Sequence, residues 1–332
     1  MDSVTQILLG AAVAGVCVPA GHRRKALMVG AALGTLPDLD VLIDYGDAVS
    51  NFTQHRGFSH SLLVLVPFAG VLWLTLRRWW RPVREAPMPW FWAIMLVLTT
   101  HPLLDAHTAY GTQLLWPLSL PPVSWSTLFI IDPLYTLPLL NAVVVVAFRP
   151  LAARARSALM LGLLLSSLYL GWSWGAKITV EAVARDALAG RGLADAPLFV
   201  TPTPFNTLLW RVVVLTEEGF LEGLYSLVAD TGEMAFGAYG SDVQSLQAAQ
   251  EVPAVQRLLW FSRGFVKARL EGDLLVLSDL RMGQEPAYVF NHAVAVRGNP
   301  HWRAITPQRV PAALDRSRLL GAVWQRIWQP GP

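Results

Sequence analysis

The stretch Ser61-Leu-Leu-Val-Leu-Val-Pro-Phe-Ala-Gly-Val-Leu-Trp-Leu-Thr-Leu76 contains no charged residue and decides the class of fold. A transmembrane helix needs about 20 mostly apolar residues, and this run approaches that length. Five more apolar segments lie in the first half of the chain, at 4–20, 26–43, 88–105, 128–148 and 157–174. We therefore expect a polytopic α-helical membrane domain of about six helices, some of them short or re-entrant.

The composition agrees with a membrane protein. Of the 332 residues, 54% are hydrophobic and only 15% are charged, whereas soluble domains carry roughly 25% charged residues. This composition excludes a disordered chain and disfavours a purely soluble enzyme. The net charge of +3 is too small to suggest a nucleic-acid partner.

Basic residues in the connections predict the orientation of the helices. The loops after the first, third and fifth segments hold ten of them: Arg23, Arg24, Lys25, Arg77, Arg78, Arg81, Arg84, Arg149, Arg154 and Arg156. The alternate loops, 44–60 and 106–127, hold only Arg56. Because cytoplasmic loops carry the excess of Lys and Arg, we expect a multi-pass protein of the cytoplasmic membrane with its N-terminus outside.

The second half of the chain has a different composition. Residues 177–332 contain 15 Lys and Arg and 15 Asp and Glu. Runs beginning at Trp210, Leu274 and Tyr288 have strand composition and lie between turn residues. We expect two domains, a helical one at 1–176 and an extracytoplasmic, β-rich α+β domain at 177–332.

Ionisable residues gather at one end of the apolar segments. In or next to these segments lie five acidic residues and four histidines: Asp2, Asp38, Asp40, Asp105, Asp132, His55, His60, His101 and His107. The predicted topology places all of them at the extracytoplasmic end. Such groups are costly in a membrane, and by default they face a polar cavity, pair with one another or bind an ion.

Two of the spacings suit a shared site. His101 and Asp105 are four residues apart and share one helical face if the helix continues through Pro102. His55 and His60 are five residues apart across a glycine. Each pair has a plainer interpretation, a histidine bonded to a neighbouring carbonyl in the first case and a polar loop in the second.

A third pair, Asp38 and Asp40, ends a glycine-rich apolar run, where helix capping is the plainer interpretation. Together, the histidines and carboxylates indicate a divalent metal ion, with zinc first and manganese or iron as alternatives. A metal ion with an open coordination position activates water, so hydrolysis is the natural chemistry.

Several separated motifs resemble the YdjM-like membrane-bound metal-dependent hydrolases over about the first 150 residues. The motifs are Met1-Asp-Ser-Val-Thr-Gln6, Leu36-Pro-Asp-Leu-Asp40, His55-Arg-Gly-Phe-Ser-His60, His101-Pro-Leu-Leu-Asp105, Trp116-Pro and Asp132-Pro-Leu-Tyr. The resemblance implies an inner-membrane metal-dependent hydrolase and carries the metal ligands onto five positions: Asp38, His55, His60, His101 and Asp105. One position departs from the family pattern, because Gln6 stands where the family usually has a histidine.

The leading functional prediction is a hydrolase at the outer membrane face that acts on a phospholipid or a lipid-linked ester. Asp40 or Asp132 would orient a ligand or act as general base. Arg56 would contact an anionic head group, or it is simply a solvated loop charge. Two other functions remain open at this stage, an ion-coupled carrier and a non-catalytic scaffold with a structural metal.

Overall fold

The computed structural model describes residues 1–299, 301–311 and 316–331. Contacts between residues divide the chain into two compact units. The helical unit comprises Met1–Ile43 and Arg56–Ser173, and the sheet unit comprises Asp44–His55 and Trp174–Pro332. A short internal segment, residues 44–55, thus leaves the helical unit and belongs to the sheet unit.

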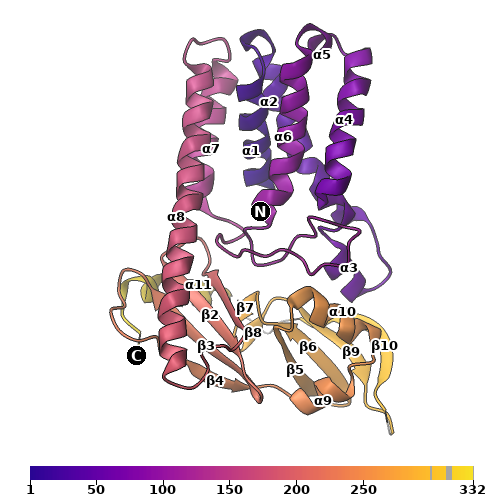
Figure 1. Ribbon diagram of the computed structural model, residues 1–332, viewed down its shortest axis with the longest axis vertical. Helices are drawn as coiled ribbons and strands as arrows, with labels where there is room; N and C mark the ends of the chain where they lie inside the picture. The colour runs from indigo at the N-terminus through magenta and orange to yellow at the C-terminus, as the bar shows by residue number, and fades with distance from the viewer. Residues whose placement is uncertain (300, 312–315, 332) are drawn as a thin grey trace. The chain divides into compact units, whose positions relative to one another are not determined.

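The helical unit is a bundle of roughly aligned helices (Figure 1). Its helices are α1 (Ser3–Cys17), α2 (Arg23–Thr35), α4 (Leu62–Trp79), α5 (Arg81–Glu85), α6 (Pro87–Asp105), α7 (Pro133–Phe148) and the first part of α8 (Ala155–Ala189). Three 3-10 turns connect them: η1 (Ala20–His22), η2 (Leu36–Leu42) and η3 (Phe58–His60). The turns η2 and η3 carry predicted site residues.

The helices α1 and α2 pack against each other through glycines. A Cβ atom at Gly10 would lie 2.2 Å from the carbonyl oxygen of Gly30, and one at Gly34 would lie 2.4 Å from that of Gln6. Only glycine permits so close an approach. The contact brings the end of α2 next to α1 and so helps to place the turn η2 that follows it.

Among the described residues, two helices, α4 and α8, are long and apolar enough to cross a membrane, rather than the expected six. The other predicted segments do form helices. However, α1 has 15 residues, α2 has 13 and α7 has 16, each short of the roughly 20 that a straight crossing needs. The expected segment 26–43 is divided because α2 ends at Thr35 and η2 follows.

The helix α8 also differs from expectation, since it continues past residue 174 to Ala189. Its later turns are not free of charge, but they keep apolar residues at helical spacing. Val180, Ala184 and Leu188 are buried in a core that includes Trp210 and Val212 of the sheet unit. The onset of charges near residue 177 therefore does not mark the end of the helix.

The sheet unit confirms the expectation of a β-rich C-terminal domain. Two antiparallel four-stranded sheets have the orders β1-β2-β3-β4 and β10-β9-β6-β5. The strands are β1 (Leu198–Pro202), β2 (Leu209–Leu215), β3 (Gly219–Ser226), β4 (Gly237–Gly240), β5 (Val266–Glu271), β6 (Leu274–Asp279), β9 (Asn291–Val296) and β10 (Arg303–Arg309). A small sheet joins β7 (Gly283–Gln284) to β8 (Ala287–Tyr288), and the helices are α3 (Ala48–Gln54), α9 (Val243–Ala248), α10 (Pro253–Ser262) and α11 (Arg316–Trp328).

Candidate metal centre

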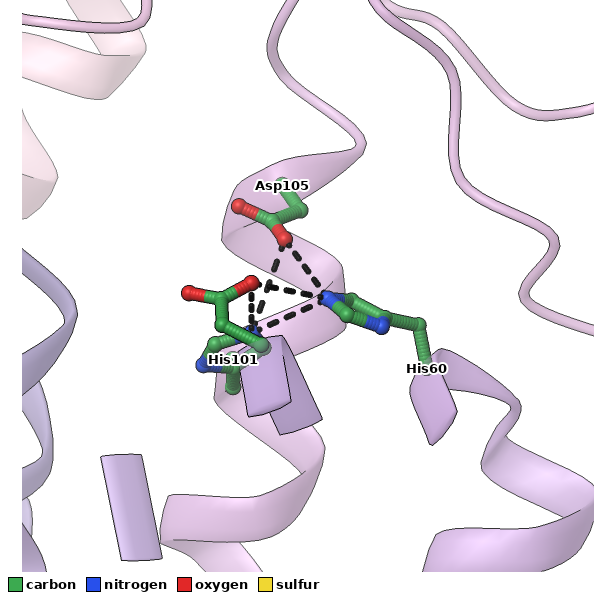
Figure 2. Close-up of side chains that lie close together, drawn as sticks. His60, His101 and Asp105 are labelled. Atoms are coloured by element: carbon green, nitrogen blue, oxygen red, sulfur yellow. Dashed lines mark hydrogen bonds and ion pairs between the residues drawn. The ribbon is translucent and has the colours of Figure 1, made fainter. Parts of the chain in front are cut away.

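Two histidines and two aspartates converge in the helical unit. The Nε2 atom of His60 lies 3.1 Å from Nε2 of His101, 3.1 Å from Oδ2 of Asp105 and 3.3 Å from Oδ1 of Asp38. The Nε2 atom of His101 lies 3.5 Å from each of the same two carboxylate oxygens. Figure 2 shows His60, His101 and Asp105 pointing toward one another.

The α6 helix supplies two members of this cluster. It continues through Pro102, so His101 and Asp105 lie one turn apart on the same face. The Nδ1 atom of His101 lies 2.7 Å from the carbonyl oxygen of Gly34. Because a carbonyl only accepts, Nδ1 carries the proton, and Nε2 of a neutral ring presents a lone pair to the cluster.

The orientation of His60 is set by the residues around η3. The Ser59 hydroxyl lies 2.9 Å from Nδ1 of His60 and donates a hydrogen bond to the carboxylate of Asp40. This arrangement lets Nδ1–H of His60 donate to Ser59, which leaves Nε2 as a lone pair. Histidines that bind a metal ion through one ring nitrogen usually make a hydrogen bond through the other, and that hydrogen bond orients the ring.

Asp105 is fully buried and uses its two oxygens differently. Its Oδ1 atom contacts the amino group of Met1 and accepts a hydrogen bond of 3.0 Å from Nε2 of Gln6. Its Oδ2 atom faces the cluster and accepts no hydrogen bond from any described residue. A buried carboxylate oxygen without a donor is costly, and a bound cation would remove that cost.

The donor set fits a divalent metal ion. Four ligands about 2.0 to 2.1 Å from a tetrahedral ion lie roughly 3.3 to 3.4 Å apart. Five of the six distances among the four atoms span 3.1 to 3.5 Å, and all four atoms lie within 4.8 Å of one another. The amino group of Met1 and Nε of Arg56 lie beside Asp105 at the edge of the cluster, and a metal ion would add positive charge between the four ligand atoms themselves. Nitrogen and oxygen donors in this mixture suit zinc, manganese or iron.

Asp38 forms the open side of the cluster. It lies in η2, and its side chain is 18% exposed, whereas those of the other three residues are buried. The apolar residues that follow it on the turn point outward, since Leu39, Val41 and Leu42 are 48%, 69% and 79% exposed. Exposed apolar side chains therefore lie on the same turn as the one partly exposed residue of the cluster.

Arg56 lies beside the cluster rather than in solvent. It is 3% exposed, its Nε atom lies 3.4 Å from Oδ2 of Asp105, and its guanidinium donates to Thr108 Oγ1 at 3.0 Å. The interpretation of Arg56 as a solvated loop charge is wrong, because the loop folds back and buries the side chain. Contact with a head group remains a prediction.

The other predicted site residues lie elsewhere. His55 is the last residue of the segment that belongs to the sheet unit and is not a member of the four-residue cluster. Asp132 caps α7 by accepting from the backbone N–H groups of Leu134 and Tyr135, and it accepts a hydrogen bond from the Tyr169 hydroxyl at 3.0 Å. Capping, a common role for a buried aspartate at a helix start, accounts for this residue.

Sequence reasoning missed three supporting groups, which are the Gly34 carbonyl, the Ser59 hydroxyl and the Gln6 amide. Nε2 of Gln6 donates to Asp105 and to the His101 carbonyl oxygen at 3.1 Å, so this side chain contacts two residues of the cluster. Backbone carbonyls leave no trace in a sequence. Ser59 adjoins His60 in the chain, and that adjacency was the one available signal.

Comparison with known proteins places the helical unit in a family. A sequence model of the YdjM inner membrane protein family matches residues 1–179, more than half of the chain. The uncharacterized protein YfhP of Bacillus subtilis (strain 168) is 26% identical over 152 residues, which cover 44% of this chain and 46% of YfhP. The inner membrane protein YbcI of Escherichia coli (strain K12) is 40% identical over 101 residues, which cover 29% of this chain and 55% of YbcI.

The chain spans about half the length of these curated relatives. No solved structure matches it significantly. The chain belongs to the YdjM inner membrane protein family, which confirms the family resemblance of its motifs.

Proposed function

We propose that this member of the YdjM inner membrane protein family is a metal-dependent hydrolase that acts on an ester or phosphoester bond of a membrane amphiphile. One observation carries the proposal. Two imidazoles, each with Nδ1 engaged behind the ring, direct Nε2 at two carboxylate oxygens, one of which is buried and accepts no hydrogen bond from any residue that the structure describes. Such convergence suits a cation better than it suits a hydrogen-bonded core.

In this proposal, His60, His101, Asp105 and Asp38 hold a divalent ion, with zinc first and manganese or iron as alternatives. When bound, the ion would lower the pKa of a bound water toward neutrality and so provide a nucleophile. Asp40 acts behind the ligands, because it holds Ser59 and thereby the ring of His60. The guanidinium of Arg56 supplies fixed positive charge next to Asp105 and would attract an anionic group of the substrate.

The class of substrate follows from the surroundings of Asp38. The exposed apolar residues Leu39, Val41 and Leu42 would contact lipid chains, while the partly exposed carboxylate next to them faces the cluster. An amphiphile fits this surface because it has an apolar part for the rim and a polar part for the ion. The distribution of Lys and Arg in the loops supports the outer face of the membrane as the location.

A second candidate function is a structural metal site in a non-catalytic scaffold. Four protein donors complete a tetrahedron, and closed four-coordinate zinc sites are typically structural. The partial exposure of Asp38 is the observation that favours the hydrolase, because this ligand is the one that solvent or substrate reaches.

Cobalt(II) loaded into the full chain in detergent distinguishes the two functions. A site with an exchangeable position changes its visible spectrum when inorganic phosphate is added, whereas a closed site does not. We expect a change, together with hydrolysis of one member of a panel of phospholipids and lipid-linked esters by the zinc, manganese or iron form.

The matched variants are His60→Ala and His22→Ala. His22 lies in η1 and contacts Glu85, away from the cluster residues. Loss of cobalt binding and hydrolysis in His60→Ala only is the expected result. Hydrolysis that persists in His60→Ala would refute the assignment, and a phosphate-insensitive spectrum without hydrolysis would favour the scaffold.

A further inference from the structure

The segment 44–55 is a part of the sheet unit that interrupts the metal-binding half of the chain. Its first residue, Asp44, comes six residues after Asp38, and its last residue, His55, comes five residues before His60. Asp38 and His60, two of the predicted ligands, therefore lie in the chain on the two sides of a segment that packs in the sheet unit.

The segment is anchored in the sheet unit by an aromatic side chain. Phe52 of α3 is 6% exposed, and its ring centroid lies 4.5 Å from that of Phe290, 4.9 Å from Phe261 and 5.2 Å from His292. Burial of so large an apolar side chain stabilises the contact of α3 with the rest of the sheet unit. Asp47 caps the start of α3 by accepting from two backbone N–H groups, so this short helix has a defined start as well as an apolar contact.

A polar contact adds a second anchor. Nε of Arg257, on α10, donates a hydrogen bond of 2.9 Å to Oγ1 of Thr53, which itself donates to the carbonyl oxygen of Val49 at 2.8 Å. The guanidinium lies over the ring of Trp260, 4.4 Å from its centroid. Thr53 is fully buried, so this hydrogen bond is protected from competing water.

Both ends of the segment connect to Asp40 in the helical unit, and at the first end the backbone N–H of Ile43 donates a hydrogen bond of 3.0 Å to the carbonyl oxygen of Asp40. The carboxylate of Asp40 accepts a hydrogen bond of 2.9 Å from the backbone N–H of Arg56 and another from the Ser59 hydroxyl. Ser59 in turn lies 2.9 Å from Nδ1 of His60. A change in the path of the chain at residues 43 or 56 therefore acts directly on the contacts that orient His60.

We propose that Phe52 and Arg257 are positioning residues for the metal centre, acting through the segment 44–55 on Asp38 and His60. The inference rests on the proposed function only in taking these two residues as ligands. The sheet unit then has a defined role, since it holds the segment 44–55, whose two ends lead along the chain to Asp38 and to His60. Changes in groups that orient metal ligands typically cost about 10- to 100-fold in affinity, and a tenfold loss is our expectation for a contact this remote.

The test compares Phe52→Ala with Phe220→Ala in the full chain. Phe220 is also a buried phenylalanine of the sheet unit, at 1% exposure, and it packs with Tyr239 and Tyr288 rather than with α3. Three properties are measured: the dissociation constant for cobalt(II), the visible spectrum of the cobalt(II) form, and, without added metal, hydrogen exchange of the backbone amides in peptides covering 36–43 and 56–62. Phe52→Leu and Arg257→Lys serve as conservative variants.

We expect Phe52→Ala to weaken cobalt(II) binding by about tenfold, to shift the cobalt spectrum and to speed exchange of the Arg56 amide, with partial recovery in Phe52→Leu. Phe220→Ala should leave all three unchanged. Equal cobalt affinity and equal exchange in Phe52→Ala and the wild type would overturn the inference. If the wild type binds no cobalt, the proposed function fails, and exchange at 36–43 and 56–62 alone decides for or against the inference.

Discussion

The two units bury charge in opposite ways. In the sheet unit, Glu222 accepts from Arg211 and from the Tyr288 hydroxyl, and the two oxygens of Asp279 accept from the guanidinium of Arg281. Each of these carboxylates has a cation on it. In the helical unit, by contrast, four atoms that could bind a metal ion lie close to one another. They belong to Asp38, His60, His101 and Asp105.

This difference separates a structural role from a binding role. A buried carboxylate paired with arginine needs nothing further to offset its burial, although the pair contributes little net stability. Asp105 also has cations of the chain beside it, since Oδ1 contacts the amino group of Met1 and Oδ2 lies 3.4 Å from Nε of Arg56. It differs from Glu222 and Asp279 because Oδ2 also faces two imidazole nitrogens and a second carboxylate, which together could hold a metal ion. The candidate metal centre therefore differs from the other buried charges in the partners of its carboxylates, which are imidazole nitrogens and a second carboxylate, and not in burial or residue type.

The largest expected effect on metal affinity comes from replacing one buried carboxylate by an amide, with the same replacement in the sheet unit as the comparison. Asp105→Asn should weaken metal binding by about a thousandfold, since removal of one partner from a buried charged set costs about 3 to 5 kcal/mol. Glu222→Gln should lower the stability of the sheet unit and leave the metal affinity unchanged. Titration of both variants with cobalt(II) measures this contrast, and equal losses in the two would remove the distinction between the units.

The next expected effect concerns His292, a buried histidine of the sheet unit that is not part of the metal cluster. Burial lowers the pKa of His292 to about 4, against the attraction of Asp279 and Asp47. In the unfolded chain its pKa is about 6.5, so the unfolded state binds the proton more readily between these values. The stability contributed by neutral His292 is therefore complete above pH 6.5, and about 3 kcal/mol of it is lost as the pH falls toward 4.

Urea unfolding of the full chain, followed by tryptophan fluorescence at several pH values, tests this expectation. The variant His292→Gln carries no ionisable group at this position and should lose that part of the pH dependence. A wild type and a variant whose stabilities fall in parallel between pH 6.5 and 4 would show that His292 does not titrate as its burial implies.

A smaller effect is expected at the position where the family usually has histidine. Gln6→Leu removes the donor to Oδ1 of Asp105 and leaves a buried carboxylate oxygen with one partner fewer. We expect metal affinity to fall about tenfold, which corresponds to the roughly 1 to 3 kcal/mol cost of an unsatisfied buried group. Gln6→His should keep more of the affinity than Gln6→Leu, and the reverse order, measured with cobalt(II), would contradict this supporting role.

The smallest effect is expected from Ser59→Ala. This change removes the hydroxyl between His60 and Asp40 but leaves both of those residues in place. Of the two hydrogen bonds lost, the one that touches the ring of His60 is neutral and contributes about 1 kcal/mol, so metal affinity should fall about fivefold. No change in affinity would mean that the ring of His60 is held by packing alone.

Much of the helical unit was predictable from the sequence, because apolar runs and the ionisable residues within them can be recognised without knowing any distant contact. Asp38, His60, His101 and Asp105 were all singled out from spacing and from the family resemblance, and the structure brings these four together. Their role as metal ligands stays a prediction. Helix lengths were predicted less well, since the caps and turns that end α1, α2 and α7 depend on packing.

The remaining differences come from contacts between distant parts of the chain. Nothing in the sequence around His55 indicates that α3 packs with Phe261 and Phe290, more than 200 residues later. The burial of Arg56 likewise depends on Asp105 and Thr108. Asp132 was a candidate site residue because it is an acidic residue next to an apolar segment. An aspartate at a helix start is equally well explained by capping.

The most direct measurement is the metal content of the full chain purified in detergent without chelators, determined by mass spectrometry. The account predicts about one zinc, manganese or iron ion per chain, lost in the double variant His60→Ala, His101→Ala and retained in His22→Ala. Absence of metal after reconstitution with each of these ions, or its retention in the double variant, would contradict the central claim.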